Sequence, residues 1–196
     1  DRSSAASDVY KRQGSEKPAN DYVIRVLDSV ADVPREIWNS LLENEADPSP
    51  FVRHEYLSAL HHSGCAITAT GWRPQVLTLW LDDRLQAACA IYLKSHSWGE
   101  YVFDWAWAQA HEQHGLPYYP KALVAVPFTP VPGARLLARS ARDRAALLQA
   151  LLHWTREQNL SSLHLLFAGE QDLHACTDAG LMLRHTVQFH LSLIHI

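Results

Sequence analysis

The sequence predicts an α/β domain whose mixed sheet carries helices on both faces. Short apolar, β-branched segments alternate along the chain with segments whose apolar residues recur at helical spacing. Two neighbouring apolar strands are joined by only three polar residues, Asp82-Asp83-Arg84, which indicates an antiparallel hairpin. The other strands are separated by helical segments, which indicates crossover connections. A hairpin combined with crossovers favours a mixed sheet over a doubly wound parallel one.

One strand and two helices are predicted in the first third of the chain. Residues 22–30 are β-branched and partly alternating, which is typical of a strand. A helix is expected after Asp32, the candidate N-cap, with Pro34 in its first turn. A second helix is expected over 53–62, before the terminating glycine Gly64. The apolar residues expected to face the core from these helices are Ile37, Trp38, Leu41, Leu42, Tyr56, Leu57 and Leu60.

The middle of the chain is expected to supply the hairpin, a helix and a central strand. The helix ends at Gly115, a conventional stop. The central strand is uncharged, as expected of a strand covered on both faces, and the prolines that follow it prevent a regular ladder from continuing. These elements are expected at 75–81 and 85–93 for the hairpin, 100–114 for the helix and 122–126 for the strand.

The last third shows the clearest helix, over 142–158, with a leucine stripe inside and Arg142, Arg144 and Glu157 expected outside. A buried strand, a short helix closed by glycine and a final alternating strand are expected after it. Their ranges are 162–168, 172–179 and 182–190.

Composition bounds the class of protein. The chain has 196 residues, of which 47% are hydrophobic, and this is ordinary for one globular domain. A net charge of −4 argues against DNA as a partner, because phosphate contacts need clustered basic residues. No apolar run reaches the roughly 20 residues of a membrane span. Three scattered cysteines, without a CxxC pair, are typical of reduced thiols in a cytoplasmic protein.

Both ends of the chain differ in character from the rest. Residues 3–13 and 191–196 resemble translated adapter sequence, and neither has the pattern of a signal peptide. Residues 1–13 and 191–196 are therefore expected to be non-native, with a domain over 14–190 that is inactive by itself. The alternative is a disordered N-terminal tail and a genuine final strand.

One helical stripe is predicted to carry polar chemistry. Glu100, Asp104, Trp107, His111 and His114 fall at i, i+4, i+7, i+11 and i+14, so they share one face of the expected helix. Carboxylates and imidazoles can act as proton carriers or zinc ligands. The histidines are three residues apart, unlike the HExxH of metalloproteases, so no metal is expected. The alternative is a polar helix face that bonds neighbouring strands or solvent.

Aromatic residues are densest in the same part of the chain. They are suited to stacking a ligand or gripping a glycan or peptide. About half of them are expected in the core instead, among them Phe103 and Trp105, by general burial tendencies. The group consists of Trp98, Tyr101, Phe103, Trp105, Trp107, Tyr118 and Tyr119.

Several motifs in this central stretch resemble a bacterial family of predicted N-acyltransferases of the GNAT superfamily, related to the Fem peptidoglycan aminoacyltransferases. The resemblance covers about residues 38–190. The motifs that carry it are GWRP at 71–74, YLK at 92–94, SWGEYVFDWAWA at 97–108, YYPK at 118–121, PFTPV at 127–131, Gly133 and RLL at 135–137.

The resemblance implies a GNAT-like fold as the first of two tandem domains, with a missing C-terminal domain of the same chain as partner. It also implies an acyl or aminoacyl transfer to an amine. A small-molecule, peptide or glycan acceptor would lie in a cleft near the first domain. The donor, acyl-CoA or aminoacyl-tRNA, would lie nearer the second. No catalytic residue is implied.

Candidate substrate-binding residues follow from the polar members of the motifs and from the helical stripe. They are Glu100, Asp104, Trp107, His111, Lys121, Thr129 and Arg135.

Two functions remain open from the sequence. An N-acyltransferase would work by positioning and by donors to a developing oxyanion. A non-catalytic module on the same fold would bind a peptide or glycan through its aromatic residues. The loop at 127–135 favours the second for this half, because three prolines remove N–H donors that a phosphate cradle needs. No GxSxG motif supports a hydrolase.

Overall fold

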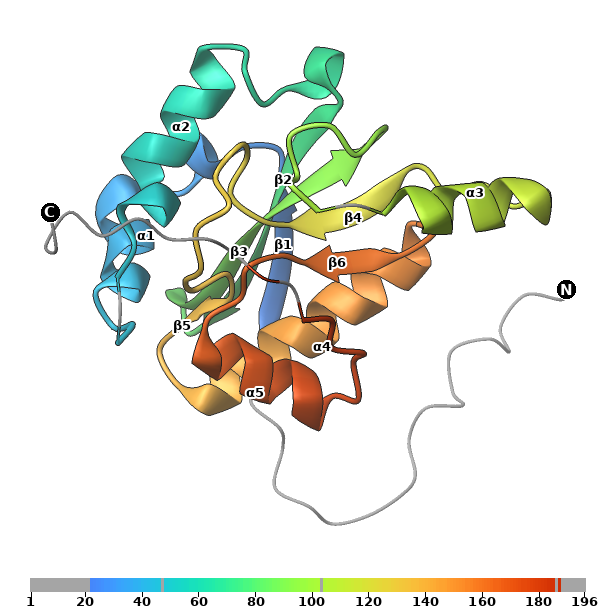
Figure 1. Cartoon of the computed structure of the whole chain (residues 1–196). Coiled ribbons are helices and arrows are strands. Elements are labelled where there is room, and N and C mark those ends of the chain that lie inside the picture. Colours follow the sequence, from blue (N-terminus) through green and yellow to red (C-terminus); the bar gives the residue numbers. More distant parts are fainter. Residues whose placement is uncertain (1–21, 47, 103, 186, 188–196) are drawn as a thin grey trace, which may run out of the picture.

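A computed structural model of the chain describes residues 22–46, 48–102, 104–185 and 187 (Figure 1). It confirms the predicted α/β class. The strands are β1 (Val23–Leu27), β2 (Trp72–Leu81), β3 (Arg84–Lys94), β4 (Lys121–Val124), β5 (Leu137–Ala138) and β6 (Leu163–Leu165). The helices are α1 (Arg35–Leu42), α2 (His54–His62), α3 (Trp105–Gln113), α4 (Ala141–Glu157) and α5 (Glu170–Asp178).

The sheet is mixed, as predicted. Its order is β1-β2-β3-β4-β6, in which β4 and β6 are parallel and the other neighbours antiparallel. The central hairpin β2–β3 turns through Asp82 and Asp83, whose φ angles are 49° and 58°. Two left-handed residues match the twist of the flanking strands, and aspartate tolerates this conformation better than most residues.

Strands β4 and β5 pair with the same edge of β3, and residues 125–136 leave the sheet between them. β4 pairs antiparallel with residues 92–94 of β3, and β5 pairs antiparallel with Ala87 and Ala88. In the described part of the chain no strand pairs with residues 89–91 at that edge. We call this stretch of β3 the strand gap. The prolines at 127, 130 and 132 explain why the ladder is not continuous.

Helices cover both faces of the sheet, as predicted. On one face, Leu77 and Ile91 pack with Leu147 and Leu151 of α4. On the other, Val76 and Ala88 belong to a cluster with the apolar residues of α1 and α2. Adjacent strand residues point to opposite faces, which is why one hairpin serves two cores. Among the described residues, no helix has the length and apolarity to cross a membrane.

Two N-terminal predictions are wrong in detail. Asp32 does not cap α1; its carboxylate instead accepts a hydrogen bond from the backbone N–H of Ser29, at 3.1 Å, and closes a short 3-10 turn. The N-cap of α1 is Pro34, which provides no side-chain cap. Ile37 is 36% exposed, because α1 presents Trp38, Leu41 and Leu42 to the core rather than the whole predicted stripe.

The predicted helix over 100–114 begins only at Trp105, so the prediction for its first turn is wrong. Gly99 and Tyr101 have φ angles of 81° and 57°, and this left-handed backbone cannot continue a right-handed helix. Trp105, expected in the core, is 73% exposed because α3 buries none of its residues. Phe103 lies outside the described residues.

The C-terminal third differs from the prediction at four places. The strand β5 intervenes between the proline-containing loop and α4. Arg144, expected outside, is only 4% exposed, because buried carboxylates pair with it. Residues 181–185 have no regular secondary structure, so the predicted last strand is absent from the part of 182–190 that the structure describes. Strand β6 is half-buried rather than buried.

Candidate functional site

A buried lysine organises one end of the sheet. Lys121, the first residue of β4, is 0% exposed. Its Nζ donates to Ser97 Oγ at 3.0 Å and to Glu100 Oε2 at 2.9 Å, and it also bonds Asp104 Oδ2. These three partners come from the segment between β3 and α3. The cationic residue therefore holds this segment against the sheet.

The same segment receives further hydrogen bonds from the two tyrosines before β4. Asp104 Oδ2 accepts from Tyr118 OH at 2.8 Å and from Ser97 Oγ at 2.7 Å. The hydroxyls of Ser97 and Tyr119 are 2.7 Å apart. We define the Lys121 cluster as Ser97, Glu100, Asp104, Tyr118, Tyr119 and Lys121.

The carboxylates of this cluster are both almost fully buried, at 3% exposed for Glu100 and 1% for Asp104. Burial raises the pKa of Glu100 against the attraction of Lys121. Burial also opposes the ionisation of Asp104, but hydrogen bonds from Lys121, Ser97 and Tyr118 hold its pKa below the usual range. Asp104 is therefore the firmer negative charge of the pair.

Three buried polar atoms at this end lack a hydrogen-bond partner among the described residues. They are Glu100 Oε1, Asp104 Oδ1 and His111 Nδ1. A buried acceptor left unpaired costs about 1–3 kcal/mol, so such atoms are rare unless another group satisfies them. The Lys121 cluster therefore has bonding capacity that the protein itself does not use.

A second buried lysine lies opposite Lys121 in the β3–β4 ladder. Lys94 is 0% exposed, and its Nζ donates to the Trp98 carbonyl at 3.1 Å. The same nitrogen lies 3.4 Å from the centroid of the Trp72 ring, a cation–π contact. Burial lowers the pKa of Lys94 to about 7.

Aromatic rings join this charged end to the strand gap. The Trp72 ring contacts Tyr92 at 5.3 Å and Phe128 at 5.2 Å between centroids. Gly99 allows this packing, because a Cβ there would lie 2.6 Å from Phe128. Tyr92 OH lies 3.0 Å from His61 Nε2 on α2. The motifs that carry the family resemblance are far apart in sequence, and they meet here at one end of the sheet.

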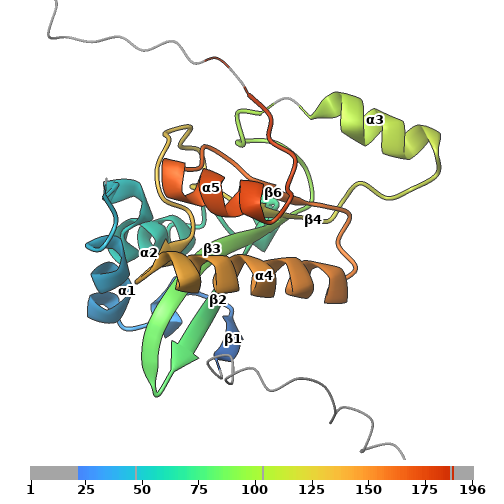
Figure 2. The same cartoon turned by 90° about the horizontal axis from the view of Figure 1, so that it is seen from below.

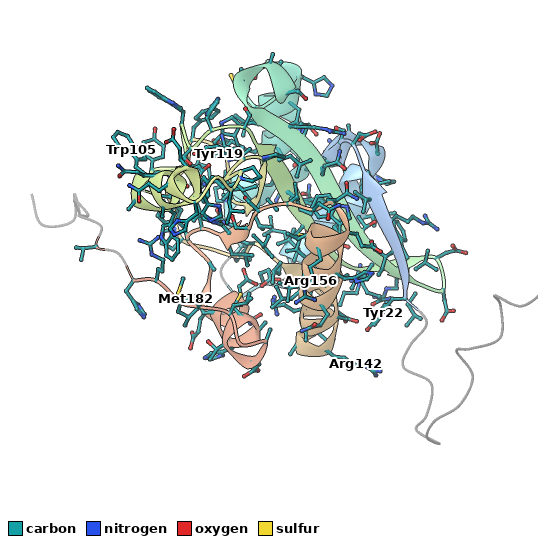
Figure 3. The ribbon with its side chains drawn as sticks, turned by 90° about the vertical axis from the view of Figure 1, so that its right-hand side faces the viewer. Tyr22, Trp105, Tyr119, Arg142, Arg156 and Met182 are labelled. Carbon is teal, nitrogen blue, oxygen red and sulfur yellow. The ribbon has the colours of Figure 1, made fainter. Side chains whose placement is uncertain are left out.

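Helix α3 stands off from the body of the protein (Figures 1 and 2). Trp107 is 46% exposed, and His111 packs edge-on against Tyr118 with 5.1 Å between centroids. Trp105 of α3 and Tyr119 lie together on this side of the molecule, while Tyr22 and Arg142 mark the other side (Figure 3). The predicted common helical stripe is wrong, because Glu100 and Asp104 precede α3 rather than lie on it.

Thr129 and Arg135 belong to the loop rather than to the Lys121 cluster. Thr129 Oγ1 donates to the Pro127 carbonyl at 3.0 Å and lies 3.1 Å from Tyr56 OH. Arg135 is 4% exposed, and its guanidinium donates to backbone carbonyls, among them that of Val131 at 2.6 Å. Burial lowers the pKa of Arg135 to about 10. Its bonds fix the shape of the loop.

Several members of the site are absent from the residues that the sequence predicts. Lys94, Ser97 and His61 are not among the predicted site residues, and Tyr118 and Tyr119 enter the prediction only as members of the aromatic group and of the YYPK motif. A usable signal existed for the lysines, since each is a charged residue at the end of a mostly apolar strand. Such a residue must find a buried partner or lie at the water boundary.

A second buried charge network lies elsewhere. Arg144 Nη2 bonds both carboxylate oxygens of Glu45, at 2.6 and 2.7 Å, and its Nε donates to Asp172 at 3.1 Å. Asp172 in turn accepts from the backbone N–H of Arg135 at 2.6 Å. This network ties α4, α5 and the turn after α1 together.

An open groove of about 570 Å³ lies beside this network, between the start of α4, α5 and the turn after α1. None of the predicted site residues lines it. Its polar lining includes Asn44, Arg139, Ser140, Arg144, Gln171 and His174. Among the residues described, no three His, Cys, Asp or Glu side chains form a group that could hold a metal ion.

Several solved structures share a distant similarity with this chain. A ribosomal-protein-alanine N-acetyltransferase from Brucella melitensis is 13% identical, with 88% of this chain and 99% of that chain covered and a TM-score of 0.47. An aminoglycoside acetyltransferase from an uncultured soil metagenomic sample is 14% identical, with coverages of 88% and 96% and a TM-score of 0.45. A Trypanosoma brucei acetyltransferase is 16% identical, with coverages of 88% and 100% and a TM-score of 0.43.

Comparison with curated proteins gave no match. A family model does match: FemAB-like, described as peptidoglycan biosynthesis/recognition, over residues 29–194. The match includes the Lys121 cluster, the strand gap and α2, and it spans most of the chain. The chain belongs to the FemAB-like family of peptidoglycan biosynthesis and recognition.

Proposed function

We propose that this chain supplies the acceptor-binding part of an enzyme that transfers an acyl or aminoacyl group to an amine. Membership of the FemAB-like family supports this class of reaction. The observation that carries the proposal is the pair of unpartnered buried oxygens in the Lys121 cluster, Glu100 Oε1 and Asp104 Oδ1.

These oxygens suit an amine-bearing acceptor. Ionised carboxylates only accept hydrogen bonds, and an ammonium group only donates them. Lys121 already occupies one oxygen of each carboxylate, so a second ammonium can bond the two that remain. Charge-assisted hydrogen bonds of this kind are shorter and stronger than neutral ones. The acceptor is therefore a small molecule, peptide or glycan derivative with a free primary amine.

The acceptor reaches the cluster by displacing α3. This helix buries none of its residues, so its movement sacrifices little apolar burial. Trp107 and His111 then line the entrance from α3. Glu100, Asp104 and Lys121 form its floor, and Thr129 and Arg135 hold the wall made by the loop. In this proposal all seven candidate residues contribute to the acceptor site or to its wall, with Arg135 acting only through the loop.

The acyl donor, acyl-CoA or aminoacyl-tRNA, is assigned to the strand gap. A small cavity of about 10 Å³ lies there, lined in part by Ala90, Val124 and Val126. An extended chain binds an unpaired strand edge through backbone hydrogen bonds, and backbone N–H groups are also the usual donors to a developing oxyanion. The rest of the donor is expected to contact the second domain of the complete protein.

The test is binding of a peptide with a free lysine amine to the complete protein by titration calorimetry. Wild type is expected to bind it at least about 10-fold more tightly than the Nε-acetylated peptide, because each charge-assisted bond is worth about 1.5–3 kcal/mol. The Glu100→Gln variant is expected to lose that preference. Glu157→Gln, which changes an exposed residue, serves as the control. Equal affinity of wild type for the two peptides would refute the acceptor site.

A non-catalytic binding module is the second candidate. Trp98, Tyr101 and Trp105 are 80%, 61% and 73% exposed, and exposed aromatic rings are suited to gripping a glycan or peptide. Under this alternative the complete protein binds its ligand without turning over any acyl donor. Product formation therefore separates the two candidates.

A further inference from the structure

A histidine–tyrosine pair lies beside the strand gap, outside the residues assigned above. His61 is in the last turn of α2, and its Nε2 lies 3.0 Å from the hydroxyl of Tyr92 on β3. The two rings meet edge-on, with centroids 5.8 Å apart. Tyr92 is 0% exposed and packs against Trp72, so the position of its hydroxyl is fixed. Tyr92 therefore holds the imidazole of His61 in one orientation.

The other nitrogen of His61 has no hydrogen-bond partner in the described part of the chain. Nδ1 is buried and forms no hydrogen bond with any described residue. When Nε2 carries the proton and donates to Tyr92, Nδ1 presents a free lone pair. A buried lone pair of this kind is satisfied when a donor reaches it. The neighbouring His62 differs, because it is exposed and its Nδ1 lies 2.7 Å from the Ser58 carbonyl.

The pair lies midway between the two halves of the proposed reaction. Ala90, Tyr92 and Lys94 alternate along β3, so their side chains share one face at intervals of about 6–7 Å. Ala90 lines the cavity in the strand gap, where the donor is assigned. Lys94 lies across the ladder from Lys121, where the acceptor is assigned. Tyr92, and with it His61, therefore lies between the two assigned sites along β3.

We propose that His61 is the general base that takes the proton from the attacking amine, with Tyr92 as its positioning residue. The inference rests on the proposed function, since it assumes acyl transfer to an amine. Nothing in the family description assigns a role to either residue.

The step balances with solvent water as the final proton acceptor. The bound ammonium first gives one proton to His61 Nδ1, which releases it to solvent. The neutral amine nitrogen then forms a bond to the donor carbonyl carbon, and its second proton passes to His61 Nδ1. The bond from that carbon to the donor sulfur, or oxygen in an ester donor, then breaks. The leaving group takes the proton back from His61. The products are an amide and a free thiol or alcohol, and the imidazole returns to its neutral state.

The charge state of His61 suits this role. Burial lowers the pKa of His61, and the adjacent His62 acts in the same direction. Among the described residues, the charged or titratable group that acts on His61 is His62, and the one that acts on Tyr92 is Tyr56. Neither is a carboxylate that would favour the imidazolium. Both burial and His62 therefore favour the neutral ring, which can act as a base.

The test is the pH dependence of transfer by the complete protein, with acetyl-CoA as donor and the lysine peptide as acceptor. For wild type, kcat/KM is expected to fall on the acid side as His61 becomes protonated. In His61→Gln, kcat is expected to drop about 100-fold or more, with KM changed less than about threefold, and the acid limb to disappear. The control His62→Gln is expected to match wild type.

Two further outcomes decide the inference. If wild type transfers the acyl group and His61→Gln keeps both the rate and the acid limb, the inference is overturned and the proposed function stands. If wild type transfers nothing from acetyl-CoA or from aminoacyl-tRNA, the proposed function fails and the inference with it. Should His61→Gln not fold, Tyr92→Phe decides: a displaced acid limb supports the pairing, and an unchanged one contradicts it.

Discussion

Lys121 and Lys94 face each other across the β3–β4 ladder, and both are fully buried, yet their surroundings differ. Lys121 has two carboxylate partners, whereas Lys94 has a carbonyl and the face of an indole ring. A buried charge is tolerated only where partners offset its desolvation. At this end of the sheet, the partners of Lys121 therefore offset the cost of burying its charge well, whereas those of Lys94 offset it poorly.

Replacing Lys121 tests the role of the cluster in the fold. Lys121→Met leaves Glu100 and Asp104 buried without their cation, and removal of one partner from a buried ion pair typically costs about 3–5 kcal/mol. Urea denaturation is expected to show a loss of this size. Arg35→Met, which removes a pair that is 59% and 72% exposed, is the control and should leave stability unchanged. A loss below about 1 kcal/mol for Lys121→Met would contradict the role given to the cluster.

Lys94 predicts a pH dependence of stability. Its pKa is lowered from 10.5 to about 7 by burial, so between these values the unfolded chain binds a proton that the folded chain does not. Stability then rises with pH through this window, because protons favour the unfolded state. Compared with Lys94→Met, wild type should gain stability from pH 7 to pH 10, as measured by denaturant unfolding. If the free energies of unfolding of the two proteins changed with pH in parallel, the pKa of Lys94 would not be lowered by burial.

At the scale of elements, α3 differs from the other α-helices that the structure describes. It buries no residue, whereas α4 buries eight. Its attachment depends on the hydrogen bonds around Asp104 and on the contact between His111 and Tyr118. Stability is not uniform across a protein, and segments with few buried apolar contacts open first. Access to the acceptor site requires such local opening of α3.

Hydrogen exchange measures that difference directly. Amides of α3 are expected to exchange by local opening, at least about 100-fold faster than those of α4, in the native protein followed by mass spectrometry. An acceptor bound beneath α3 should slow the exchange of α3 and leave α4 unaffected. Equal protection of the two helices in the free protein would mean that α3 is a fixed part of the core.

For the whole molecule, periodicity predicted the mixed sheet, the hairpin and the helices on both faces, because these follow from local apolar patterns. The prolines after the central strand predicted that its ladder stops, but the return of the chain as β5 to the same edge of β3 could not be predicted, since that depends on long-range pairing. Glu100, Asp104 and Lys121 were named as candidates, but left-handed Gly99 and Tyr101 set their arrangement. The prediction that Arg144 is exposed is wrong because a charged residue on a helix usually faces solvent. The buried carboxylates that pair with Arg144 are distant from it in sequence.

The tandem second domain stays a prediction, as do the non-native ends at 1–13 and 191–196, which lie outside the described residues. The second domain matters for the whole molecule because the donor is expected to contact both domains. We assign the acceptor to the Lys121 cluster and the reacting carbonyl to the strand gap, and a transfer assay tests both assignments at once.

The most direct measurement is therefore mass spectrometry of an amine-bearing peptide after incubation with the complete protein and acetyl-CoA or aminoacyl-tRNA. Wild type is expected to add one acyl or aminoacyl group to the free amine. The double variant Glu100→Gln/Asp104→Asn is expected to modify no peptide but still to bind the donor. Its melting temperature should therefore still rise with added donor, since a ligand at 100 times its Kd stabilises the folded state by about 2.7 kcal/mol. A wild-type protein that binds the peptide and modifies it with neither donor would contradict the account and identify a binding module.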